Sequence, residues 1–102
     1  MQRMRLANEQ VRMIKQIADR VLGAPSRVWL FGSRADDALR GGDIDLLVET
    51  DAVLANRAQA VCAIYGATIM ALGEHKIDVL LKDGQTPDAP VFEIAKRTGV
   101  LL

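Results

Sequence analysis

Two short runs decide the fold: DIDLLVE at Asp43–Glu49 and KIDVLLK at Lys76–Lys82. Polar and apolar residues largely alternate in both runs, which is the period of a β-strand with one buried face. The same period places Asp43 and Asp45 together on one face of the first run, and Asp78 on the matching face of the second. The two runs therefore predict strands that carry three carboxylates on the faces opposite their apolar sides.

The remaining chain predicts helices that cover a small sheet. Apolar residues recur at three- and four-residue steps in three segments, the pattern of amphipathic helices. These segments are residues 8–22, 52–72 and 91–97, and a further β-rich run lies at Arg27–Phe31. We expect an α/β fold, a small mixed β-sheet with helices packed mainly on one face, forming a single domain over residues 1–102.

The order of these elements predicts where the acids meet. A helix between two strands normally makes them parallel neighbours, whereas the short connection before Asp43 favours an antiparallel pair for the first two strands. The turn Gly32-Ser33, which ends the first strand, then reaches the same end of the sheet as Asp43, Asp45 and Asp78. We therefore expect three carboxylates and a Gly-Ser turn to converge at one rim.

Such a rim has a definite chemistry. Magnesium prefers carboxylate oxygens together with water and substrate phosphates, and a cation relieves the repulsion among crowded acids. Two metal ions about 3.5–4 Å apart can activate an attacking oxygen and stabilise a leaving one. A Gly-Ser turn allows close backbone approach to a triphosphate and supplies a hydroxyl donor. These parts together indicate nucleotidyl transfer, whereas a solvated strand face and an ordinary turn are the simpler interpretations.

Residues 30–35, LFGSRA, and residues 42–48, GDIDLLV, resemble the signature of the minimal nucleotidyltransferases of the DNA polymerase beta-like superfamily. That signature joins a Gly-Ser turn to Asp-x-Asp on a strand about ten residues later. A third acid on a later strand completes it, and Asp78 matches that position. The chain departs from many relatives in one respect, because Gly42 stands where they have serine before Asp-x-Asp.

The resemblance implies a nucleotidyltransferase-like fold and a role for each matching residue. Gly32 and Ser33 are expected to hold the nucleotide phosphates. Arg34 could steady a phosphate or could equally be a surface charge. We expect three acids to be catalytic and to bind two Mg²⁺ ions: Asp43, Asp45 and Asp78. Asp78 is also expected to help deprotonate the acceptor hydroxyl.

The resemblance also implies a reaction and a partner. We expect magnesium-dependent transfer of a nucleoside monophosphate, AMP from ATP, to an acceptor hydroxyl. Only about twenty residues follow the third strand, so the acceptor is expected to come from a bound protein. Minimal members are often encoded with a small all-helical HEPN toxin and adenylylate a tyrosine on it. We therefore expect an antitoxin that AMPylates such a toxin. The alternatives are a non-catalytic binding antitoxin or scaffold subunit, and transfer to a small molecule.

Composition limits the other classes of partner. Thirteen basic residues balance thirteen acidic ones, which argues against a dedicated nucleic-acid surface. No apolar run approaches the roughly 20 residues that cross a bilayer, and no signal-peptide pattern is visible, so we expect a cytoplasmic protein with no membrane partner. The single cysteine fits a reducing compartment.

The rest of the pattern concerns packing. Cys62 and Tyr65 are expected on the buried face of the long helix, the methionines are expected to pack in helices, and Glu49 is expected to be a surface charge. Four apolar residues alternate away from the face that the helices are expected to cover: Trp29, Phe31, Leu47 and Leu80. Either the C-terminal segment folds across them, or they contact a second subunit or partner.

Overall fold

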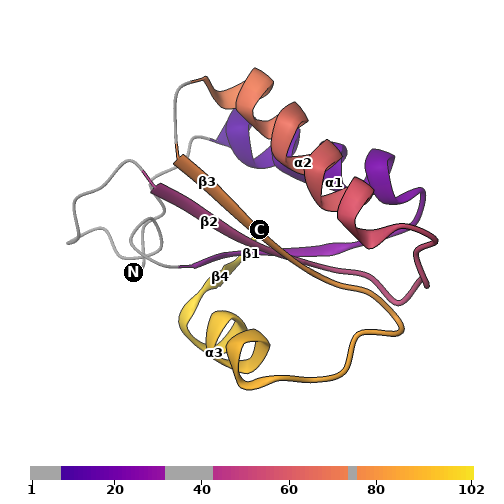
Figure 1. Ribbon diagram of the computed structural model, residues 1–102. Coiled ribbons are helices and arrows are strands. Elements are labelled where there is room, and N and C mark those ends of the chain that lie inside the picture. The colour runs from indigo at the N-terminus through magenta and orange to yellow at the C-terminus, as the bar shows by residue number, and fades with distance from the viewer. Residues whose placement is uncertain (1–7, 32–42, 74–75) are drawn as a thin grey trace.

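The fold is a sheet with helices on both faces, seen in a computed structural model that describes residues 8–31, 43–73 and 76–102. Asp43 is described through its backbone. The elements follow in the order α1 (Asn8–Leu22), β1 (Arg27–Phe31), β2 (Asp43–Glu49), α2 (Arg57–Leu72), β3 (Lys76–Lys82), α3 (Pro90–Thr98) and β4 (Val100–Leu101) (Figure 1). The predicted bounds of β1, β2 and β3 are confirmed.

The strands form one mixed sheet in the order β3-β2-β1-β4. β2 and β3 are parallel, and β1 is antiparallel to both β2 and β4. The predicted directions of the first three strands are therefore confirmed. β4 was not predicted, because two residues paired at an edge carry too little pattern to identify a strand.

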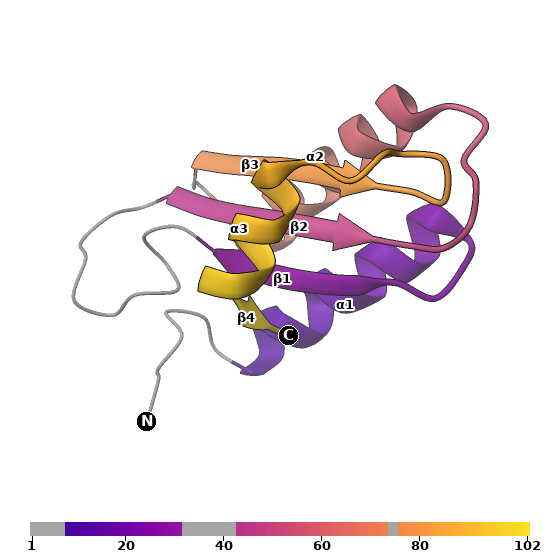
Figure 2. The same cartoon turned by 90° about the horizontal axis from the view of Figure 1, so that it is seen from below.

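The main core lies between the sheet and the two long helices. α1 and α2 cover one face of the sheet, and α3 lies against the other (Figures 1 and 2). Side chains from three strands and both helices fill this layer, and the best-buried ones are Ile14, Ala18, Leu30, Ile44, Leu46, Val48 and Ile64. In the strands these residues stand at alternate positions, as the two-residue period predicts.

The second face of the sheet is covered by the C-terminal segment. Leu47 is completely buried there against Phe92 and Ala95 of α3. Trp29, Phe31 and Leu80 pack around this contact and are partly buried. Of the two explanations for these four apolar residues, folding of the C-terminal segment across them is confirmed, with α3 as the cover.

The long helix differs from its prediction in both its start and its buried face. It begins at Arg57 rather than at residue 52, and the Asn56 side chain caps it by accepting a 3.0 Å hydrogen bond from the backbone N–H of Gln59. Its buried residues are Ile64, Thr68 and Leu72, whereas Cys62 and Tyr65 are exposed. Apolar residues stand on every side of this helix, so their spacing could not identify the side that faces the sheet.

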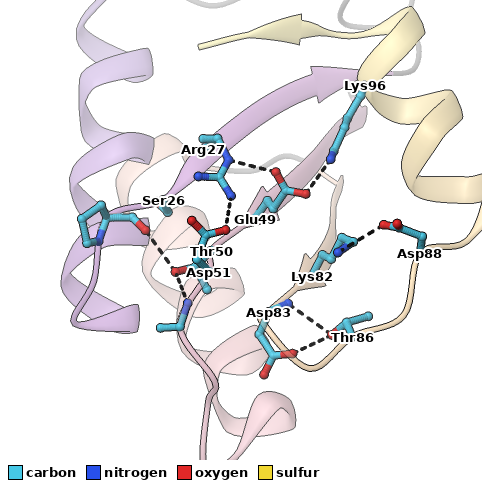
Figure 3. Close-up of polar contacts among 12 residues, drawn as sticks. Ser26, Arg27, Glu49, Thr50, Asp51, Lys82, Asp83, Thr86, Asp88 and Lys96 are labelled. Atoms are coloured by element: carbon cyan, nitrogen blue, oxygen red, sulfur yellow. Dashed lines mark hydrogen bonds and ion pairs between the residues drawn. The ribbon is translucent and has the colours of Figure 1, made fainter.

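Asp83 holds the loop before α2 against the loop after β3. Its buried carboxylate accepts hydrogen bonds from the backbone N–H groups of Leu54 and Gln85, both at 3.0 Å. It also accepts a 2.7 Å hydrogen bond from the Thr86 hydroxyl (Figure 3). The bond from Leu54, followed by that from Thr86, lowers the pKa of Asp83 to about 2 despite desolvation. This contact keeps residues before Arg57 out of the helix.

Glu49 joins α3 to the sheet instead of lying on the surface as predicted. It is 9% exposed, and its carboxylate accepts hydrogen bonds from Arg27 Nε at 2.9 Å and from Lys96 Nζ at 2.5 Å (Figure 3). Burial raises the pKa of Glu49, but the hydrogen bonds from Lys96 and Arg27 outweigh it, so the pKa lies below its usual value. Lys96 Nζ also lies 5.3 Å from the centre of the Trp29 ring, a cation–π distance.

Candidate functional site

Asp45 and Asp78 occupy the same row of the sheet. In the parallel pair β2–β3, Asp45 is the register partner of Asp78, and Asp43 is the partner of Lys76. Residues in register on parallel strands point to the same face, and neighbouring strands lie about 4.8 Å apart. Asp43 precedes Asp45 by two residues, so its position belongs to that face as well. The predicted meeting of these positions at one end of the two strands is therefore what the backbone shows.

The acids lie on the α3 face of the sheet, beyond the part that α3 covers. Leu47, two residues after Asp45, is completely buried against α3. Asp78 is exposed and Asp45 is half-buried. In Figure 2 the starting ends of β2 and β3 extend past α3. The acid row, by which we mean Asp45 and Asp78, is therefore open to solvent on one side and bounded by apolar packing on the other.

The far end of the same face has the opposite electrostatic character. There Glu49 is bound by two cations, and Lys82 Nζ lies 3.3 Å from a carboxylate oxygen of Asp88. Acids at that end are neutralised by protein groups and help to hold α3. Beside the acid row, Lys76, the exposed register partner of Asp43, places a cationic residue on the same face. The sequence pattern already placed Lys76 on this face but did not mark it as a site residue.

The described side chains provide two of the three predicted metal ligands. Among them, no group of three acidic, histidine or cysteine residues is close enough to hold a metal ion. The acid row contributes two carboxylates, and the third predicted ligand, Asp43, is placed only as a strand position. Two carboxylates in one row, reachable from solvent, are an oxygen-donor set of the kind that magnesium uses together with water and phosphate.

The predicted phosphate-binding residues Gly32, Ser33 and Arg34 lie outside the described residues. The described part of β1 ends immediately before them at Phe31, and Phe31 is the register partner of Asp45. The chain therefore leaves β1 in the row that contains Asp45 and Asp78. The end of the described part of β1 therefore lies at the same end of the sheet as the acid row.

Each helix in the described ranges falls short of the length and apolar character that a membrane-spanning helix needs.

No curated protein matches the chain significantly. The model of the nucleotidyltransferase domain family matches residues 11–99, which include every described strand through β3, all of α2 and α3, and most of α1. The small mixed sheet and its helices agree with the fold of that family. The chain therefore belongs to the nucleotidyltransferase domain family, in the DNA polymerase beta-like superfamily.

Proposed function

We propose that this chain transfers AMP from ATP to a hydroxyl group of a partner protein in a magnesium-dependent reaction. Nucleotidyl transfer is the activity that membership of the family supports. The observation that carries the finer proposal is the pairing of Asp45 with Asp78 in one solvent-accessible row. Two carboxylates at register positions on adjacent strands are donors of the kind that suit a bound metal and nucleotide.

Asp45 and Asp78 fit magnesium by donor type and by position. Both offer carboxylate oxygens on adjacent strands, and Asp43 occupies the neighbouring row on the same face. The metal, when bound, would stabilise the charge that develops on the phosphate oxygens. Holding it at the rim of a rigid sheet keeps the ligands in place without any rearrangement of the backbone.

The chain's own residues then have distinct tasks. Gly32, Ser33 and Arg34 hold the triphosphate, and the ammonium group of Lys76 adds positive charge at the same rim. Asp78, the more exposed of the two acids, accepts the proton of the attacking hydroxyl. The acceptor oxygen forms a bond to the α-phosphorus, the bond between the α- and β-phosphates breaks, and pyrophosphate leaves.

A protein acceptor suits the surface beside the acid row. α3 lies on the same sheet face, and its side chains Val91 and Ile94 are 46% and 49% exposed. Exposed apolar side chains next to a reaction site offer contact to a macromolecule. By analogy with minimal nucleotidyltransferases, we propose that the acceptor is a tyrosine of a small all-helical HEPN toxin and that the modification neutralises it.

Label transfer tests this proposal directly. The purified chain is mixed with α-³²P-labelled ATP, magnesium and the toxin, and label on the toxin is measured together with toxin activity. We expect labelling that is lost with EDTA and with Asp45→Asn. Asp88→Asn is the matched control, because it removes an exposed carboxylate from the far end of the same face. If Asp45→Asn still neutralises the toxin without labelling it, the result would instead favour a binding antitoxin.

A further inference from the structure

The outer face of α2 is almost free of charge, although it points away from the core. Within Arg57–Leu72 the sequence has one charged residue, Arg57, in sixteen positions. The guanidinium of Arg57 donates to the backbone oxygen of Leu81 at 2.8 Å and lies 4.0 Å from the Asp83 carboxylate. It is therefore directed at the C-terminal end of β3 and at Asp83, which follows that strand. Helices at a protein surface normally carry charged residues on their outer side, so a neutral face is typical of a covered one.

Several side chains on this face are large or apolar and stand in solvent. Met70 is 87% exposed and Tyr65 is 45% exposed, and Cys62 is exposed one turn before Gly66. The methionine was expected to pack within the protein, and in the single chain it does not. Burial of these groups against another surface removes apolar area from water and is favourable by about 25 cal/mol for each Å².

A groove runs along this face between the two long helices. It has a volume of about 480 Å³ and is lined mainly by apolar side chains, among them Met13 and Ile17 of α1 and Ala67 and Met70 of α2. Of the described residues that line it, Arg20 is the one with a charge. A shallow apolar groove beside a neutral helix receives side chains from another helix better than it receives a charged ligand.

This surface lies on the wrong side of the sheet for the acceptor substrate. α1 and α2 cover one face, whereas α3 and the acid row belong to the other (Figures 1 and 2). A protein whose hydroxyl reaches Asp45 and Asp78 must approach from the α3 face. Two molecules joined through α2 leave both acid rows open.

We propose that the outer face of α2, defined by Cys62, Tyr65, Gly66 and Met70, is the contact between two copies of this chain. The lack of charge on this face favours a second copy as the occupant, because the face can meet its own copy about a two-fold axis without placing like charges opposite each other. The small residues Ala63 and Gly66 let two helices approach closely, and Met70 of each copy can enter the apolar groove of the other.

Sedimentation velocity over about 1–200 µM protein tests this association, with dimers in that range expected to have micromolar dissociation constants. We expect a mass of twice 11.1 kDa at the upper concentrations. Met70→Glu should raise the dissociation constant at least about tenfold through an unpaired charge in the contact. Ile94→Glu is the matched control, since it places the same charge on α3, on the other side of the sheet, and it should leave the mass unchanged.

Crosslinking with a short bis-maleimide supplies a second readout. Cys62 is the chain's one cysteine and lies within one turn of the middle of α2, so a two-fold helix pair brings both thiols close together. We expect a crosslinked dimer that Met70→Glu reduces and Ile94→Glu preserves. Asp45→Asn should dimerise normally, which separates this association from the proposed catalysis. A wild-type chain that stays monomeric, a dimer insensitive to Met70→Glu, or a toxin that requires Met70 for binding would each overturn the proposal.

Discussion

Asp45 and Asp78 stand directly opposite each other on two parallel strands, one half-buried and the other exposed. Two like charges in one row of a sheet repel each other, and cross-strand pairs of this kind are destabilising. Glu49, on the same strand face as Asp45, is bound by two protein cations, Arg27 and Lys96. The end of the face with Glu49 holds α3, and the end with Asp45 and Asp78 is the part that we assign to substrate.

Asp78→Asn should remove activity without weakening the fold. The substitution keeps the shape of an exposed side chain and takes away one of two neighbouring negative charges. In the absence of divalent cations we expect an unchanged or slightly higher melting temperature, whereas the rise produced by magnesium with a nonhydrolysable ATP analogue should be lost. Thermal unfolding with and without ligand measures both effects. A full ligand-induced rise in Asp78→Asn would show that this carboxylate does not hold the metal–nucleotide.

Lys96→Met should loosen the packing of α3. The change preserves the aliphatic length over Trp29 but removes the charged donor to the partly buried Glu49 carboxylate. We expect a loss of about 1.5–3 kcal/mol in the free energy of unfolding, as is usual for a hydrogen bond to a charged group. Urea unfolding of Lys96→Met, Glu49→Gln and the double variant gives the coupling energy of the pair. Additive losses would show that the two side chains act independently.

Asp83 should make stability depend on pH in the acid range. Its folded pKa of about 2 lies below the ordinary value of 3.8, so its contribution is complete above the unfolded pKa and is lost as the pH falls toward 2. Glu49, whose pKa is also lowered, contributes with the same sign. Unfolding free energies at pH 7 and pH 3 should therefore differ less in Asp83→Asn than in the wild type. Equal losses in both proteins would contradict this assignment.

Ile94→Lys should weaken transfer to a protein acceptor while leaving nucleotide binding intact. Ile94 is 49% exposed on α3, which lies on the same face of the sheet as the acid row, and it is not among the buried residues of that helix. We expect the KM for the protein acceptor to rise about tenfold or more, the cost of losing one well-placed apolar contact and gaining a charge. The melting-temperature rise with magnesium and the ATP analogue should stay the same. Val53→Lys, an exposed apolar position outside α3, is the control and should change neither quantity.

The strands and their directions could be predicted because their signals are local. Alternation along Asp43–Glu49 and Lys76–Lys82 defines each strand, and the helix between them requires a parallel pair. The rim with its acids follows from those two facts, since the register places Asp45 beside Asp78. The roles of these residues as ligands and catalysts stay predictions.

The wrong predictions concern features that depend on contacts between residues far apart in the sequence or on a helix without a clear apolar face. The start of α2 depends on Asp83, which is far along the chain and captures the N–H of Leu54. The buried face of α2 could not be read from a helix that is apolar all round, so Cys62 and Tyr65 were placed inside, although both are exposed. Glu49 is buried because Lys96, forty-seven residues later, returns to it. No local pattern carries information of that kind.

Paramagnetic broadening by Mn²⁺ tests the central claim most directly, because it locates the bound cation without relying on activity. Amide signals are recorded by NMR for the wild type with a nonhydrolysable ATP analogue and substoichiometric Mn²⁺. The account predicts selective broadening around Asp45, Lys76 and Asp78, and loss of that broadening in Asp78→Asn but not in Asp88→Asn. Broadening centred on Glu49, Asp51 and Asp83 at the opposite end of the sheet, or an identical pattern in Asp78→Asn, would contradict it.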